Sequence, residues 1–144
     1  MNLMAPKLLL RMSSVIMVLH AVGHTIGVAT WTSENSQVPK VVIEAMKNND
    51  FVFQQAPATM AKFYDGMGYA ATIALLFLSS VLWVASSVDS KNRKIAALFL
   101  WPSIAFMVLM GLDEIIYFFP MAAAFSLVSA GLTLTALVLV RRGQ

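Results

Sequence analysis

Four long apolar runs, separated by shorter polar segments, dominate the chain. The runs extend over about residues 8–29, 64–86, 95–118 and 120–140. A membrane-spanning helix needs about 20 mostly apolar residues to cross roughly 30 Å of hydrocarbon, and each run reaches that length. The runs are too long and too uniformly apolar for barrel strands. The pattern therefore predicts an all-α, four-transmembrane-helix bundle that forms one integral membrane domain.

The longest polar segment, residues 30–63, contains a shorter periodic stretch. Pro39 can open a helix that continues to about Asn49. One face of this helix carries only apolar residues, namely Val38, Val41, Val42, Ala45 and Met46. This spacing predicts an amphipathic helix that lies at the membrane surface or over the mouth of the bundle. A solvated loop helix is the alternative interpretation.

The composition supports a membrane protein and excludes several other classes. Hydrophobic residues make up 59% and charged residues 12% of the 144 positions, against roughly 45–50% and about 25% in soluble domains. A water-soluble monomer is therefore excluded. The chain has no cysteine, which excludes disulfides, thiolate metal sites and cysteine nucleophiles. The net charge of +3 gives no argument for a nucleic-acid partner, so the predicted partner is the lipid bilayer.

The distribution of basic residues predicts the orientation of the spans. With the N-terminus inside, the inner segments hold seven of the ten basic residues and one acidic residue. The outer segments and span ends hold the other three basic residues and six acidic residues. Cytoplasmic segments carry an excess of lysine and arginine. We therefore expect a cytoplasmic (inner) membrane location with both termini in the cytoplasm and a short basic inner loop over residues 87–94.

The last run carries a stripe of small residues at helical spacing. The stripe consists of Ala122, Ser126, Ala130, Thr133 and Ala136. Small residues allow helices in lipid to approach closely, so this stripe predicts a helix-packing face rather than a functional site.

Ionisable residues inside the runs gather toward one side of the membrane. His20 and His24 lie four residues apart in the first run, so they share one helix face. Asp65 lies at the start of the second run, and Asp113 and Glu114 lie near the end of the third. Ionisable groups within a span are costly and usually face the protein interior. The sequence therefore predicts a pocket near the outer face, partly covered by the outer loop.

The residue types in this predicted pocket suggest acid–base chemistry. His24 would carry the proton, and Glu114 would orient the His24 imidazole or favour its charged form. Asp65 would add a second carboxylate. Adjacent residues point roughly 100° apart, and we expect Glu114 rather than Asp113 to face inward. The predicted ligand-binding residues are His20, Thr25, Tyr64, Asp113 and Tyr117.

Two ligand chemistries remain open for this pocket. One is a hydrophobic small molecule such as a sterol, isoprenoid, quinone or lipid, entering from the outer leaflet. The other is a metal, because two histidines one helical turn apart can bind one ion with a carboxylate from a neighbouring helix. His20, His24 and Glu114 would then hold zinc or iron.

Two further functions compete with ligand binding. In a non-enzymatic structural or accessory subunit, the polar residues would pair only with each other or with a partner. In an ion or proton transporter they would form part of a pathway. The inner halves of the runs offer few polar groups beyond hydroxyls such as Ser13, Ser14 and Ser79, so transport would require a homo-oligomer.

Two short motifs in the first half of the chain resemble those of a known family. Residues 23–27 read Gly-His-Thr-Ile-Gly, and residues 62–68 read Lys-Phe-Tyr-Asp-Gly-Met-Gly after an Ala-Met pair and Phe51 or Phe53. They resemble the motifs of a family of small, mostly uncharacterised bacterial four-helix membrane proteins, with Met67 in place of the usual phenylalanine. The resemblance implies the four-helix fold and a membrane location, marks His24 as the signature histidine, and implies no established reaction.

Overall fold

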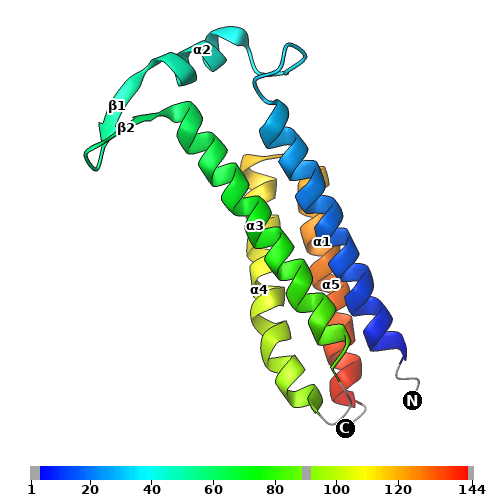
Figure 1. Cartoon of the computed structure of the whole chain (residues 1–144). Coiled ribbons are helices and arrows are strands. Elements are labelled where there is room, and N and C mark those ends of the chain that lie inside the picture. Colours follow the sequence, from blue (N-terminus) through cyan, green and yellow to red (C-terminus); the bar gives the residue numbers. More distant parts are fainter. Residues whose placement is uncertain (1–3, 89–91, 143–144) are drawn as a thin grey trace. The chain divides into compact units, whose positions relative to one another are not determined.

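The computed structural model describes residues 4–88 and 92–142, which form five helices and one β-hairpin (Figure 1). The predicted inner loop over residues 87–94 is therefore described only in part, since residues 89–91 lie outside the described residues. The elements in chain order are α1 (Met4–Thr30), α2 (Lys40–Asn48), β1 (Asp50–Phe53), β2 (Ala56–Thr59), α3 (Met60–Ser86), α4 (Arg93–Tyr117) and α5 (Pro120–Arg142). The all-α class is confirmed.

The four apolar runs correspond to the four long helices α1, α3, α4 and α5. Each of them is long and apolar enough to cross a membrane, which identifies a multi-pass membrane protein. The helices extend beyond the apolar runs. The helix α3 begins at Met60, four residues before the predicted start, because helical hydrogen bonding continues past Lys62, the one charged residue among positions 60–63.

The chain divides into two compact units, and we describe each by itself. The core unit comprises Met1–His20 and Leu75–Gln144, and the loop unit comprises Ala21–Ala74. The core unit therefore contains segments of all four long helices. The loop unit contains the end of α1, the start of α3, and the α2 helix and hairpin between them.

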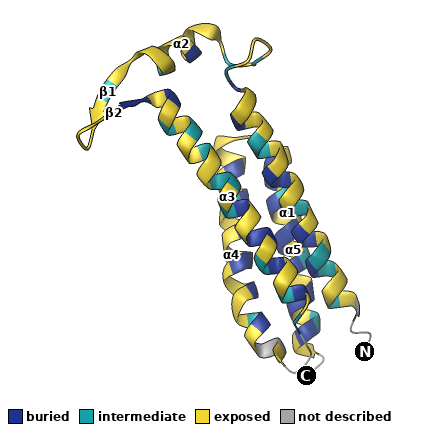
Figure 2. Cartoon of the chain, viewed as in Figure 1, coloured by how far each residue is buried: buried dark blue, intermediate teal, exposed yellow. Residues whose placement is uncertain are grey.

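Close packing of α4 against α5 organises the core unit. All five residues of the predicted small-residue stripe on α5 are buried, which confirms that this stripe is a packing face. On α4, a Cβ atom added to Gly111 would lie 2.7 Å from the Cδ2 atom of Leu127, so glycine is needed for this approach. Much of α4 is exposed (Figure 2), and apart from Asp113 its exposed positions include large apolar residues such as Leu98, Leu109 and Ile116. In a membrane, such a surface faces lipid.

Buried hydroxyl groups join α1 to its neighbours within the core unit. The Ser13 Oγ donates a hydrogen bond of 3.0 Å to the backbone oxygen of Ser129 and lies 2.9 Å from the Thr133 Oγ1. On another face of α1, Ser14 and Ser79 each donate to the backbone oxygen of the other residue, at 2.8 and 3.0 Å. Small hydroxyl side chains allow this close approach and supply hydrogen bonds that lipid cannot.

The loop unit has a small hydrophobic core of its own. Trp31, Ile43 and Ala61 are buried, and Val38 and Met46 pack against them. Ile43 and Met46 come from α2, so the amphipathic helix predicted over residues 39–49 is confirmed, with observed bounds Lys40–Asn48. One part of its apolar face covers Trp31 and Ala61 of the neighbouring helix ends.

A short antiparallel hairpin, which the sequence did not predict, follows α2. The strands pair from Asp50 opposite Thr59 to Phe53 opposite Ala56. Gln54 and Gln55 form the two-residue turn with φ values of 48° and 66°, the left-handed region typical of tight hairpin turns. Such turns normally contain asparagine, aspartate or glycine, so the Gln-Gln pair gives no turn signal.

Candidate ligand-binding site

The core unit brings one histidine and one carboxylate into direct contact. The His20 Nε2 atom of α1 lies 3.1 Å from the Glu114 Oε1 atom of α4. His20 is 5% exposed and Glu114 is 4% exposed, whereas the neighbouring Asp113 is exposed. Glu114 lies two turns along α4 from Met107, which is fully buried, so both residues are on the packed face of the helix. The expectation that Glu114 rather than Asp113 faces inward is confirmed.

The second ring nitrogen of His20 contacts the third helix of the site. The Nδ1 atom lies 3.4 Å from the Ser126 Oγ of α5, and the imidazole stacks on Phe125 with ring centroids 5.6 Å apart. A neutral imidazole has one donor and one acceptor nitrogen. When Nε2–H donates to the carboxylate, Nδ1 is left to accept the hydroxyl proton of Ser126. The two contacts are thus compatible with a single tautomer and orient the ring between α4 and α5.

One carboxylate oxygen of Glu114 differs from the other in its contacts. Among the described residues, the buried Glu114 Oε2 receives no hydrogen bond. An acceptor that is buried without a partner costs about 1–3 kcal/mol, and more when the group is charged. A donor from outside the chain would remove this cost, so a ligand that bonds to Oε2 would need a donor group.

His24, the other histidine of α1, makes a different contact, within the loop unit. The His24 Nε2–H donates to the backbone oxygen of Gly68 at 3.1 Å, and Thr25 and Thr72 have their hydroxyl groups 3.1 Å apart. A Cβ atom added to Gly68 would lie 2.5 Å from the Cγ2 atom of Val28. The Gly-His-Thr segment therefore holds α1 close to α3.

Asp65 also has a partner in the loop unit. The indole Nε1–H of the buried Trp31 donates to the Asp65 Oδ1 at 2.8 Å. The ring of Tyr64 lies 4.8 Å from that of Trp31, although Tyr64 is partly exposed. Because α3 begins at Met60, Asp65 is not the helix cap. Its carboxylate instead accepts a hydrogen bond from Trp31, which belongs to the core of the loop unit, and so holds the indole ring in place.

The predicted site residues thus fall into three groups. His20 and Glu114 meet in the core unit, whereas His24, Thr25, Tyr64 and Asp65 make their contacts in the loop unit. Asp113 is exposed, and so is Tyr117, at 73%. Glu114 therefore contacts His20, although the sequence analysis had assigned the proton-carrying role beside Glu114 to His24.

Two residues that contact His20, namely Ser126 and Phe125, are not among the site residues predicted from the sequence. Ser126 belongs to the stripe that was interpreted as packing alone, and nothing in the sequence distinguishes Phe125 from the other apolar residues of its run. Trp31, the partner of Asp65, was also missed, because a tryptophan near the end of a span is typical of a membrane interface.

A metal site receives no support from the arrangement. Within residues 4–88 and 92–142, no three His, Cys, Asp or Glu residues come together in a group that could hold an ion. The His20–Glu114 pair supplies two ligands, and a structural or catalytic zinc site usually has at least three from the protein.

Comparisons of the chain with protein-family models, with curated proteins and with solved structures find no match. The resemblance carried by the two short motifs therefore stays a prediction.

Proposed function

We propose that this membrane protein binds a hydrophobic small molecule through the buried His20–Glu114 pair. The observation that supports this is the unpartnered Oε2 of Glu114, an acceptor inside the protein with no donor among the described residues. A ligand that satisfies it needs a hydrogen-bond donor, such as a hydroxyl or amine, on an otherwise apolar body. Sterols, isoprenoid alcohols and reduced quinones all meet this description.

The same pair has the groups needed for acid–base chemistry on such a ligand. The imidazole of His20 can pass a proton to or from the bound hydroxyl or amine, and Glu114 stabilises the imidazole when it is protonated. Ser126 and the stacked Phe125 hold the ring in place. In this proposal His20 takes the proton-carrying role, because it is the histidine in contact with Glu114.

The membrane orientation is also part of the proposal. The excess of basic residues on the segments that would be inside favours cytoplasmic termini in an inner membrane. In this orientation His20 and Glu114 lie in the outer half of the spans, and the ligand would enter from the outer leaflet.

A non-enzymatic structural role is the second candidate. One observation favours it, since both ring nitrogens and the ring face of His20 are already engaged by residues of α4 and α5. In that case the pair would only hold three helices together. The two candidates differ in whether anything binds at Oε2.

Mass spectrometry of molecules that copurify with the full-length protein separates the two candidates. The protein is extracted with its surrounding lipid and compared with the Glu114→Gln and Asp113→Asn variants. Each variant replaces one carboxylate on α4 by an amide, but only Glu114 is buried. Gel filtration and thermal unfolding check that both variants fold.

Ligand binding predicts a hydroxyl- or amine-bearing apolar molecule with the wild type and the Asp113→Asn variant, at a much lower level with Glu114→Gln. Identical molecules at equal levels in all three samples would overturn the proposal and favour the structural role. Elemental analysis of the same samples tests the metal alternative.

A further inference from the structure

Only part of the apolar face of α2 packs against the rest of the loop unit. At roughly 100° per residue, the polar residues gather on one side of the helix and leave more than half of its circumference apolar. Ile43 is buried and Met46 packs on the loop-unit core, yet Val41 is 71% and Val42 is 42% exposed. The second part of the apolar face therefore has no partner among the described residues of the chain.

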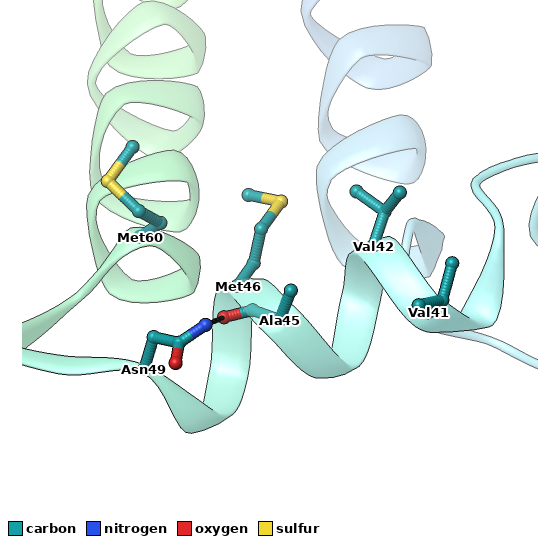
Figure 3. Close-up of a pocket in the computed structure, with 6 residues that line it drawn as sticks. All are labelled: Val41, Val42, Ala45, Met46, Asn49 and Met60. Carbon is teal, nitrogen blue, oxygen red and sulfur yellow. Dashed lines mark hydrogen bonds between the residues drawn. The ribbon is translucent and has the colours of Figure 1, made fainter.

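This uncovered part forms one wall of a groove of about 430 Å³. The groove is lined by Val41, Val42, Ala45, Met46, Asn49 and Met60 (Figure 3). Asn49 is the polar exception, and its side-chain N–H donates to the backbone oxygen of Ala45 at 2.8 Å. The lining thus offers little to a polar ligand and suits a flexible apolar chain.

The groove opens toward the part of the loop unit that enters the membrane. Figure 3 shows the side chains of Val42, Met46 and Met60 pointing to the side on which α1 and α3 run. Met60 is the first residue of α3, which is long and apolar enough to span a membrane. The groove is thus continuous with the start of a helix that can span a membrane.

The polar side of α2 is suited to the lipid headgroups. Lys40 and Lys47 lie seven residues apart, two turns along the helix, and both are exposed; the exposed Glu44 lies between them, so two basic residues and one acidic residue leave this face with a net positive charge. Lysine side chains at an interface keep their ammonium groups at the level of the headgroups while their methylene stems cover apolar surface. An interfacial helix binds through this combination of a buried apolar face and a basic polar face.

We propose that the groove beside α2 holds an acyl chain of a membrane phospholipid, and that α2 lies in the membrane interface with Val41 and Val42 toward the hydrocarbon. This inference concerns the loop unit and does not depend on binding at the His20–Glu114 pair. Lipid in the groove would complete the burial of the amphipathic face, which the chain itself covers only in part.

Spin labelling of the full-length protein in lipid nanodiscs tests this inference. The chain has no cysteine, so the variants Val42→Cys and Val41→Cys each carry one label on the apolar face. Lys47→Cys is the matched control on the polar face of the same helix. The nanodiscs contain dioleoyl phosphatidylcholine and phosphatidylglycerol, and power saturation measures label accessibility to oxygen, which concentrates in hydrocarbon, and to a water-soluble nickel chelate.

The expected result is an oxygen-to-nickel accessibility ratio several times higher at Val42→Cys and Val41→Cys than at Lys47→Cys. Equal ratios at the three positions would overturn the proposal, because the apolar face would then be in water. Low accessibility to both reagents at the apolar face would also overturn it, since protein, such as a second copy of the chain, would cover the groove. Val41 is the more exposed position and keeps the test decisive if the Val42→Cys variant does not fold.

Discussion

The energetic coupling between His20 and Glu114 can be measured by replacing each residue by leucine, alone and together. The His20→Leu variant leaves a carboxylate that is 4% exposed without the one contact it makes among the described residues. Leaving a buried charge without its partner costs about 3–5 kcal/mol. The Glu114→Leu variant leaves a neutral imidazole nitrogen without a partner, which costs about 1–3 kcal/mol.

The double variant removes both polar groups and leaves two apolar side chains that can pack together. Replacing a buried pair by apolar residues of similar volume is often close to neutral. The two single losses add to about 4–8 kcal/mol. We expect the stability of the double variant to fall by about 1–3 kcal/mol, because it loses only the stacking on Phe125 and the contact with Ser126. The coupling energy is then at least about 1 kcal/mol.

Unfolding in mixed micelles of a mild detergent and sodium dodecyl sulfate, followed by tryptophan fluorescence, measures these free energies. The three tryptophans of the chain supply the signal. Asp113→Leu is the control, because this carboxylate is exposed and its loss should change stability by no more than about 0.5 kcal/mol. The double variant could instead lose as much free energy of unfolding as the two single variants together, to within about 0.5 kcal/mol. In that case the two side chains do not stabilise one another, and the pair does not contribute to the stability of the fold.

Two further predictions concern helix contacts in the two units, and thermal unfolding of the purified protein measures both. Ser13→Ala removes the hydrogen bond that joins α1 to α5 and should lower stability by about 1 kcal/mol. The control is Ser80→Ala, at an exposed position whose hydroxyl bonds within its own helix, and it should change stability by less than about 0.5 kcal/mol. Equal losses in the two variants would contradict the role of Ser13. Gly68→Ala should cost about 1–3 kcal/mol because its methyl group would overlap the Val28 side chain, while Gly66→Ala, which meets nothing within 4 Å, should be neutral or slightly stabilising. Combining Gly68→Ala with Val28→Ala should restore part of the loss, and no recovery would show that the overlap is not its cause.

The helices could be predicted from the sequence because hydropathy and periodicity are local properties. Four runs of about 20 apolar residues define the spans, and the spacing of apolar residues after Pro39 defines α2. The hairpin could not be predicted in this way. Its turn uses Gln54 and Gln55 with positive φ, and neither residue type signals that conformation.

The partners of the polar residues could be predicted only in part. The spacing of His20 and His24 shows that they share a helix face, but it does not show which neighbouring helix meets each one. Burial of Glu114 could be predicted from its spacing of two turns from Met107 on α4, yet Tyr117, three residues further along the helix, is 73% exposed. Tyr117 lies roughly 60° away from Glu114 around the helix axis and is the last residue of α4, so the packed face no longer includes it.

The most direct test of the proposed function is an experimental structure of the protein crystallised from a lipid phase, at a resolution that shows ligands near Glu114. We expect density for an elongated apolar molecule whose hydroxyl or amine group lies within about 3.2 Å of the Oε2 atom. Density that shows Oε2 bonded to a protein side chain, or to an ordered water with no other molecule beside it, would contradict the proposal that the His20–Glu114 pair is a ligand-binding site.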